Sequence, residues 1–182
     1  MIFTPTPLTG AYLIDLDKKE DHRGFFARAF CENEFRQRNL FTRFSQVNNS
    51  FSLQKGTLRG MHYQLAPKAE AKLVRCIRGS LFDMILDLRP SSPTFGHSFG
   101  AELSADNCRM IYVPKGFAHG ALTLMNETEM IYFVDEFYSP TFERVIRYND
   151  PKFNLKWPLA PIVISDKDKN QTDFKPEWHY GA

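Results

Sequence analysis

The sequence predicts an all-β protein built as an antiparallel sandwich or barrel. Short runs of alternating apolar and polar residues recur along the chain, Gly and Pro residues separate these runs, and helical periodicity is scarce. The 17 Phe residues agree with this prediction, because Phe suits the half-buried surface of a sheet. Many short strands with Gly and Pro corners are typical of sandwiches and barrels.

Length and composition indicate one domain, residues 1–182, of an ordinary globular protein, since 43% of the residues are hydrophobic and 24% are charged. The net charge of +2 is too small to favour binding to nucleic acid or to a membrane surface. No window approaches the roughly 18 apolar residues of a membrane span, and the opening MIFTPTPLTG does not have the pattern of a signal peptide. Cys31, Cys76 and Cys108 contain no CxxC pair, and three reduced thiols fit a cytoplasmic protein.

Residues 31–40 carry the best helical pattern, with Phe35 and Leu40 roughly on one face. Residues 71–90 predict two strands around the turn Arg78-Gly79-Ser80. In the second strand one face is wholly apolar and is expected to pack in the core, whereas the other is mixed and suits the lining of a cavity. The apolar face contains Phe82, Met84, Leu86 and Leu88, and the mixed face contains Leu81, Asp83, Ile85 and Asp87.

Further strands follow along the chain. Residues 109–126 predict two strands with a Pro-Gly corner between them, and residues 129–138 predict another. On that last strand Met130, Tyr132, Val134 and Glu136 would share a face. The segment from Asp150 onward is rich in Pro and charge and is expected to be irregular.

Two of the five histidines stand out by their context. His62 lies in RGMHYQ (59–64) and His119 in PKGFAHG (114–120), and each is expected on a strand that could aim it into one cavity. On a regular strand His62 would face the same way as Gly60 and Gln64, with Arg59, Met61 and Tyr63 on the opposite face. His97 and His179 lie among polar or turn residues and are expected to have no functional role.

The spacing of the two motifs resembles the cupins, a family of small jelly rolls built on a double-stranded β-helix. Metal-binding cupins carry His-x-His in the first motif, but Gln64 stands at the second position here. A first-row metal needs three or four nitrogen, sulfur or carboxylate ligands, and an amide is a poor substitute. The sequence therefore disfavours a metal-dependent dioxygenase or isomerase, and we expect no bound metal.

A more specific resemblance covers residues 15–168. Nine stretches in order resemble the dTDP-4-dehydrorhamnose 3,5-epimerase family of nucleotide-sugar epimerases. This resemblance implies an all-β, cupin-like jelly roll with a few short helices. The stretches are DHRGFF (21–26), QVNNSFS (46–52), GTLRGMHYQ (56–64), residues 72–96, VPKGFAHG (113–120), Tyr132, YSPTFE (138–143), NDPKFNLKWP (149–158) and SDKD (165–168).

The resemblance implies chemistry on a nucleotide-linked 4-keto-6-deoxyhexose of the dTDP-4-dehydro-6-deoxyglucose type. C3 and C5 of this sugar flank the C4 carbonyl, so a base can remove their protons and an acid can return a proton to the opposite face. No metal or organic cofactor is needed if the protein stabilises the enolate. The expected role is the synthesis of a rhamnose-like deoxysugar for cell-surface polysaccharide such as O-antigen.

The resemblance also implies a role for individual residues. His62 matches the base, Asp168 the carboxylate that orients it, Lys72 the cation beside the enolate oxygen, and Tyr132 the proton donor. Taken without the resemblance, the lysine could be a solvated charge, the tyrosine a buried ring and the aspartate a turn cap. The matches to substrate-binding residues are Arg23, Arg28, Gln46, Asn48, Arg59, His119, Glu143 and Lys167.

The chain departs from the family pattern at three positions. Arg28 stands where the family usually has a nucleotide-binding glutamate, Phe133 where it often has lysine, and Tyr148 where it usually has tryptophan. The alternatives are therefore an enzyme that epimerises C3 or C5 alone, on a CDP- or GDP-linked 4-keto sugar, and a jelly roll that binds a nucleotide sugar without turnover. The family also implies a homodimer, with residues 1–15 as the segment that would be exchanged.

Overall fold

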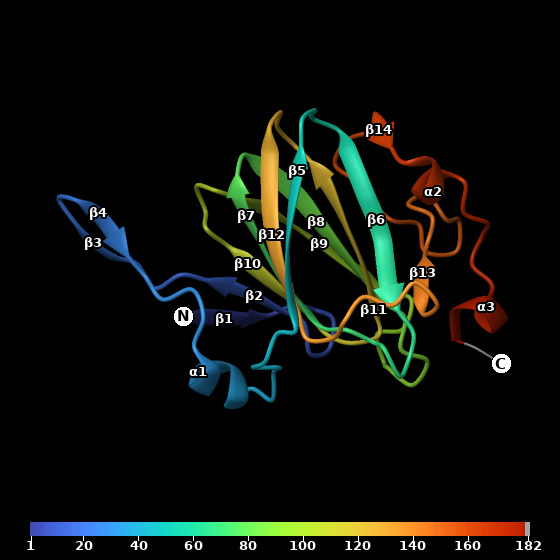
Figure 1. Ribbon diagram of the computed structural model, residues 1–182, viewed down its shortest axis with the longest axis horizontal. Helices are drawn as coiled ribbons and strands as arrows, with labels where there is room; N and C mark the ends of the chain where they lie inside the picture. The colour runs from blue at the N-terminus through green and yellow to red at the C-terminus, as the bar shows by residue number, and fades with distance from the viewer. Residues whose placement is uncertain (181–182) are drawn as a thin grey trace.

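Two β-sheets face each other in the computed structural model, which describes residues 1–180 (Figure 1). All neighbouring strands of the two sheets run antiparallel except β14, which pairs with β6 in parallel. This arrangement confirms the predicted all-β architecture. The first sheet has the order β1 (Ile2–Pro5), β2 (Tyr12–Asp15), β10 (Met110–Val113), β7 (Lys72–Arg78), β12 (Thr128–Val134) and β5 (Gln46–Ser52). The second has the order β13 (Glu143–Val145), β6 (Thr57–Gln64), β11 (Phe117–Thr123), β8 (Ser80–Asp87) and β9 (Ser98–Ser104), with β14 (Val163–Ile164) beside β6.

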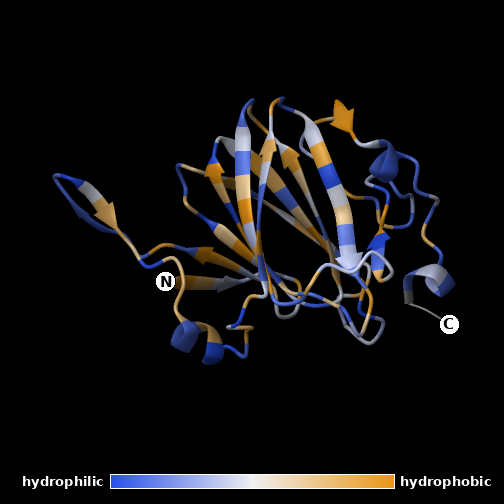
Figure 2. Ribbon diagram, viewed as in Figure 1, coloured by the Kyte–Doolittle hydropathy of each residue, from blue (hydrophilic) through white to orange (hydrophobic). Residues whose placement is uncertain are grey.

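A short hairpin projects from this body, as Figure 1 shows at the left. It consists of β3 (Lys19–Asp21) and β4 (Gly24–Phe26), which pair only with each other, and we call residues 19–26 the arm. All residues of both strands are exposed. Figure 2 shows hydrophobic residues on β4, where Phe25 is 48% exposed and Phe26 is 75% exposed.

The core covers both faces of the second sheet, and a further cluster packs Phe35 of α1 against the first sheet. Between the two sheets, Val74 and Ile111 of the first pack with Leu81, Ile85 and Phe117 of the second. On the other side, irregular C-terminal chain covers the sheet with Ile146, Phe153, Leu155 and Phe174. Burial of apolar area on both faces contributes about 25 cal/mol per Å².

The structure confirms one of the two faces predicted for β8 and corrects the other. The apolar face is confirmed, because Met84, Leu86 and Leu88 are buried under the C-terminal chain. The prediction that the mixed face lines a cavity was wrong for Asp87, which is fully buried and accepts hydrogen bonds from Arg89, Ser92 and Thr94. These three donors stabilise the carboxylate where it lies, so it needs no open cavity.

The helix expected over residues 31–40 is shorter than predicted. α1 spans Glu32–Arg36, and Phe35 is its buried residue. Asn39 adopts a positive φ of 57°, and the Leu40 amide bonds back to the Phe35 carbonyl, which is how a left-handed residue ends a helix. Leu40 is 9% exposed, so the two apolar residues still pack together although the helix does not reach Leu40.

The expectation of an irregular C-terminal segment is largely confirmed. Only β14, α2 (Asp166–Lys169) and α3 (Pro176–Tyr180) are regular among the described residues after Asp150. His179 is buried, stacks on Phe174 and bonds the Tyr63 hydroxyl through Nδ1, a packing role consistent with the expectation that it is not functional. No helix within residues 1–180 is long and apolar enough to cross a lipid bilayer.

A bulge in β6 overturns the regular alternation expected for residues 59–64. His62 pairs with His119 on β11 while Arg59 pairs with Ala121, so β6 spans three residues where β11 spans two. The extra residue turns Arg59 to the same side as His62, because a bulge reverses the alternation beyond it. Gly60 lies at the bulge with φ +129°.

Gly60→Ala is expected to lower the free energy of unfolding by about 2–5 kcal/mol. A Cβ at this position would meet the Gly120 Cα at 2.5 Å and the His119 carbonyl oxygen at 2.8 Å, and both are backbone atoms. Urea unfolding followed by circular dichroism measures the loss. Gly96→Ala is the matched control, because Gly96 also has positive φ but its Cβ would find nothing nearer than 3.9 Å. Equal losses in the two variants would contradict the packing argument.

Candidate active site

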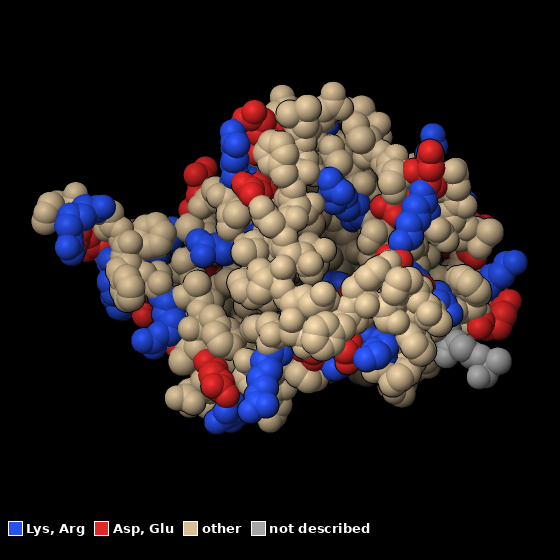
Figure 3. All heavy atoms as spheres, in the orientation of Figure 1, with Lys and Arg blue, Asp and Glu red and all other residues tan. Residues whose placement is uncertain are grey.

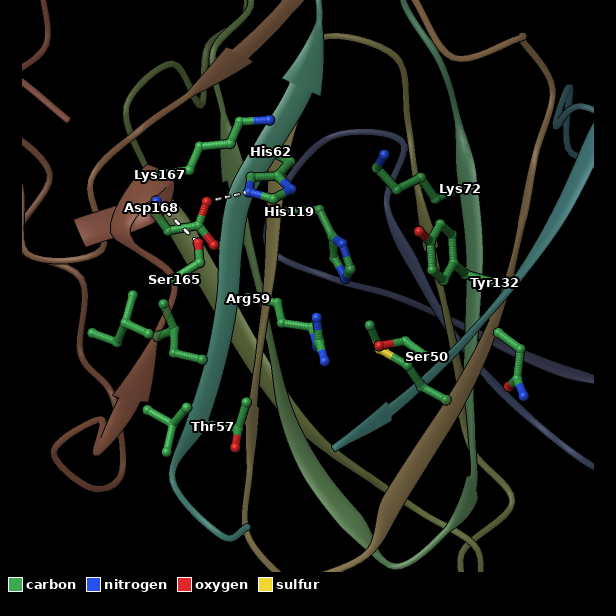
Figure 4. Close-up of a pocket in the computed structure, with 15 residues that line it drawn as sticks. Ser50, Thr57, Arg59, His62, Lys72, His119, Tyr132, Ser165, Lys167 and Asp168 are labelled. Carbon is green, nitrogen blue, oxygen red and sulfur yellow. Dashed lines mark hydrogen bonds and ion pairs between the residues drawn. The ribbon is translucent and has the colours of Figure 1, made fainter. Parts of the chain in front are cut away.

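Two adjoining cavities open between β5, the edge strand of the first sheet, and β6 of the second sheet. The larger is about 570 Å³ and the smaller about 170 Å³, and His62, Lys72 and Tyr132 line both. Figure 3 shows this face hollowed, with basic and acidic side chains at the edge of the hollow. The close-up shows His62 and Tyr132 on opposite sides of the larger cavity (Figure 4).

His62 is held by a carboxylate from a distant part of the chain. Its Nε2 lies 2.7 Å from Asp168 Oδ1, while Asp168 Oδ2 accepts the Gly60 amide at 3.2 Å. Ser165 caps α2 by accepting the Asp168 amide, which fixes the carboxylate on the first turn. Burial alone would raise the pKa of Asp168, but its hydrogen bond with His62 and the Gly60 amide hold it below the usual value.

This contact defines the tautomer of the neutral imidazole. A carboxylate only accepts hydrogen bonds, so Nε2 of His62 carries the proton and Nδ1 is left as the acceptor. Nδ1 points away from Asp168 (Figure 4). A histidine that acts as a base with a supporting carboxylate requires this geometry, and the base role of His62 stays a prediction.

Lys72 and Tyr132 lie side by side across the cavity from His62 (Figure 4). Lys72 comes from the start of β7 and Tyr132 from β12, and the two strands are hydrogen-bonded neighbours. The lysine side chain is 7% exposed and its Nζ donates to Glu70 Oε1. Burial raises the pKa of Tyr132, the Glu70 carboxylate raises it further, and Arg59 opposes both. The phenol is therefore held in its protonated form.

His119 forms a second histidine–carboxylate pair beside the first. Its Nε2 lies 2.7 Å from Asp83 Oδ2, and the imidazole and the carboxylate are 9% and 0% exposed. Burial raises the pKa of Asp83, and the neighbouring His119 works against it. The mixed face predicted for β8 thus reaches the site through this one carboxylate, which supports His119.

The predicted substrate-binding residues divide into two groups. Six of them line the cavities, while the exposed Arg23 pairs with Asp21 on the arm and the exposed Arg28 follows the arm, outside both cavities. Among the first group, Arg59 is tied to β5 through Ser52 Oγ and the Phe51 carbonyl. The six are Gln46, Asn48, Arg59, His119, Glu143 and Lys167.

Sequence reasoning did not assign Glu70, Asp83, Ser165 or Tyr138 to the site. Tyr138 donates to Glu143 Oε2 at 2.9 Å, and these two line the smaller cavity. Lys167, which lines the larger cavity, donates to the same oxygen and so links the two cavities. Glu70 precedes Lys72 by two residues, and that spacing could have indicated a pair on one side of an extended chain.

Gln64, which replaces the second cupin histidine, has a structural role. Its Nε2 donates to the Lys68 carbonyl at 2.8 Å, and its Oε1 accepts the Ser139 amide at 2.5 Å. Within residues 1–180, no three His, Cys, Asp or Glu side chains gather as a candidate metal site. Metal independence stays a prediction.

A jelly roll with a carboxylate-supported histidine facing a phenol and an ammonium defines an acid–base enzyme that moves protons on carbon. The model of the dTDP-4-dehydrorhamnose 3,5-epimerase family matches residues 5–176. The chain is 46% identical over 155 residues to the dTDP-4-dehydrorhamnose 3,5-epimerase of Shigella flexneri, covering 85% of each protein. The chain belongs to the dTDP-4-dehydrorhamnose 3,5-epimerase family.

Solved structures agree with this assignment. The dTDP-4-dehydrorhamnose 3,5-epimerase of Elizabethkingia anophelis superimposes with a TM-score of 0.92 at 38% identity, covering 96% of both chains. The dTDP-6-deoxy-D-glucose-3,5-epimerase of Legionella pneumophila, in complex with dTDP-4-keto-L-rhamnose, superimposes with a TM-score of 0.84 at 38% identity, covering 92% of this chain and 89% of that one. The predicted cupin-like jelly roll is confirmed.

Proposed function

We propose that the protein epimerises a dTDP-linked 4-keto-6-deoxyhexose at C3 and C5, in the synthesis of a rhamnose-like deoxysugar. The observation that carries the proposal is the arrangement of three side chains around the larger cavity. His62 and Tyr132 lie on opposite sides of it, and Lys72 lies beside Tyr132 (Figure 4). Binding alone would need no acid and base on opposite sides of one cavity, so this placement favours an enzyme over a binding protein.

The proposed reaction runs through an enolate. His62 removes the proton from C3 or C5, and the electron pair of that C–H bond moves to the C4 oxygen. Lys72 stabilises the oxyanion, because its positive charge is fixed in place and its side chain is largely shielded from solvent. Tyr132 gives its proton to the opposite face of the carbon, and solvent then reprotonates the phenolate while the imidazolium loses its proton.

The test is turnover in deuterated buffer with dTDP-, CDP- and GDP-4-keto-6-deoxyhexoses, followed by NMR. We expect deuterium at C3 and C5 of the dTDP sugar with inversion at both carbons, and the same rate after treatment with a strong chelator. Deuterium at one carbon alone would identify a mono-epimerase. Binding without exchange would identify a nucleotide-sugar-binding protein, and activity restored by one metal would overturn the expected metal independence.

We also propose that the protein acts as a homodimer in the cytoplasm. The arm exposes Phe25 and Phe26, and the outer side of the first sheet exposes Val47, Phe51 and Ile77 by 54%, 45% and 43%. A second copy that covers these residues would bury apolar area. Residues 1–15 pair with the chain's own β10 through β2, so we assign the exchanged element to the arm instead. The cytoplasm is supported by the three free cysteines.

In such a dimer the arm would carry Arg23, and the chain just after the arm would carry Arg28, to the cavity of the partner. Mixing His62→Ala chains with Arg23→Ala chains tests this, because a mixed dimer then holds one cavity with both an intact base and an intact arm. We expect activity to reappear after unfolding and refolding the mixture, with a dimer mass by light scattering. A monomer at micromolar concentration, or a mixture as inactive as its parents, would contradict the proposal.

Arg28→Glu is expected to change the order of nucleotide affinities. An arginine donates where a carboxylate accepts, so the substitution reverses hydrogen-bond polarity at the nucleotide. A swap of this kind changes discrimination by roughly 1–3 kcal/mol. Calorimetry with dTDP, CDP and GDP on both proteins measures it, with exposed Arg36→Glu on α1 as control. An unchanged order would show that Arg28 does not contact the base.

A further inference from the structure

Glu70 is a largely shielded carboxylate of the smaller cavity that the proposed mechanism leaves unused. Its side chain is 11% exposed, and it lines the cavity together with Lys72 and Tyr132. One carboxylate oxygen accepts from Lys72 Nζ, and the other accepts from Gln64 Nε2 at 3.3 Å. Gln64 is itself held by the backbone of Lys68 and Ser139, so both oxygens of Glu70 are fixed.

We propose that Glu70 is a positioning residue that holds Lys72 by an ion pair and places its negative charge beside the Tyr132 phenol. The inference rests on the proposed function of the site. An ammonium has three N–H donors, so the pair with Glu70 leaves two for the substrate. A lysine buried without a partner would be costly in the free enzyme, and the ion pair with Glu70 offsets part of that cost.

The same charge acts on the proposed acid. A negative charge beside a phenol opposes its ionisation, and the Glu70 carboxylate contributes to the raised pKa of Tyr132. Tyr132 must be protonated to deliver a proton, so loss of the Glu70 charge should bring the alkaline loss of activity to lower pH. The charged and titratable groups that face this part of the site are Arg59 and His62 on β6, Lys72 on β7, Asp83 on β8, His119 on β11, Glu143 on β13, Lys167 and Asp168 on α2, and Tyr138 between β12 and β13.

Three variants separate the two effects. Glu70→Gln keeps a hydrogen-bond acceptor but loses the charge, Glu70→Asp keeps the charge but is shorter, and Glu70→Ala loses both. Glu127→Gln, in the exposed loop between β11 and β12 where Glu127 pairs with Arg78, is the matched control. Each of these proteins is also made with the additional substitution Tyr132→Phe. Subtracting the phenolate absorbance of the second protein from that of the first leaves the titration of Tyr132 alone.

We expect Glu70→Gln to move the Tyr132 transition of the ligand-free protein down by roughly one pH unit, the usual size of an environmental shift. Glu70→Asp and Glu127→Gln should leave it near the wild-type position. The alkaline limb of kcat/KM should move with the phenol. Glu70→Ala, which frees Lys72, should also lower kcat by about 10- to 100-fold without a matching rise in KM.

An unmoved Tyr132 transition in Glu70→Gln overturns the proposal, whether or not the wild-type protein turns over a sugar nucleotide. A wild-type kcat in Glu70→Ala at neutral pH overturns the positioning of Lys72. The phenol titration needs no substrate, so its outcome is independent of the proposed reaction. A moved transition in a protein without epimerase activity would support the placement of Glu70 and overturn the proposed function.

Discussion

His62→Ala is expected to abolish both epimerisation and exchange of the substrate's C3 and C5 protons with solvent. Two imidazoles with a supporting carboxylate line the cavity within residues 1–180, and His62 is the more accessible, with 36% of its side chain exposed against 9% for His119. Loss of a positioned general base costs about 10²–10⁴-fold in rate. NMR in deuterium oxide measures exchange and inversion in the same sample.

His97→Ala is the control for this experiment, because His97 is exposed and lines neither cavity. It should retain wild-type exchange and inversion. Calorimetry should show that His62→Ala still binds dTDP, since the base acts on the sugar rather than on the nucleotide. Full exchange by His62→Ala would remove this histidine from the base role, and the neighbouring His119 would become the candidate.

The position of His62 was predictable from its motif, but the direction of its neighbour Arg59 was not. A strand pattern gives alternation, and the bulge that reverses it depends on pairing with β11, which lies nearly 60 residues further along the chain. Gly60 gave a signal of an irregular strand, since glycine inside a strand often marks a bulge. The sequence did not show on which side of the glycine the alternation changes.

The carboxylates were harder to predict than the histidines. Asp83 and Asp87 were predicted to share one face of their strand. In the structure Asp83 instead contacts His119, while Asp87 accepts a hydrogen bond from Arg89 in the loop that follows β8. Which partner each acquires depends on how β8 sits against β11 and against the following loop. Local periodicity contains neither contact, whereas the resemblance to a family located Asp168 because it carries tertiary information in its motif order.

Arg23 and Arg28 show a further limit of a linear sequence. Their motif predicted substrate contacts, but the described chain places both away from its own cavities. A motif marks a residue for a site without stating which copy of the chain contains that site. Both observations agree if the arm reaches the cavity of a second copy of the chain, and the mixing experiment tests this.

Tyr132→Phe is expected to separate exchange from inversion. The variant keeps the ring and its packing against the core between the sheets but loses the phenolic proton. His62 can still remove a proton and return a deuteron from solvent to the same face. Solvent deuterium should therefore enter the substrate while the configuration stays largely unchanged, with inversion slowed by about 10²–10⁴-fold. Tyr148→Phe, outside both cavities, is the control.

The reason that exchange should survive lies in Lys72. Formation of the enolate requires a base and a stabilised oxyanion, and both remain in Tyr132→Phe because Lys72 is held by Glu70 rather than by the phenol. Inversion additionally requires a donor on the face opposite His62, and Tyr132 is the phenol that lies there (Figure 4). Inversion at the wild-type rate in Tyr132→Phe would mean that water or another side chain delivers this proton. Loss of exchange together with inversion would mean that Tyr132 also helps to form the enolate, and the division of roles between the two faces would fail.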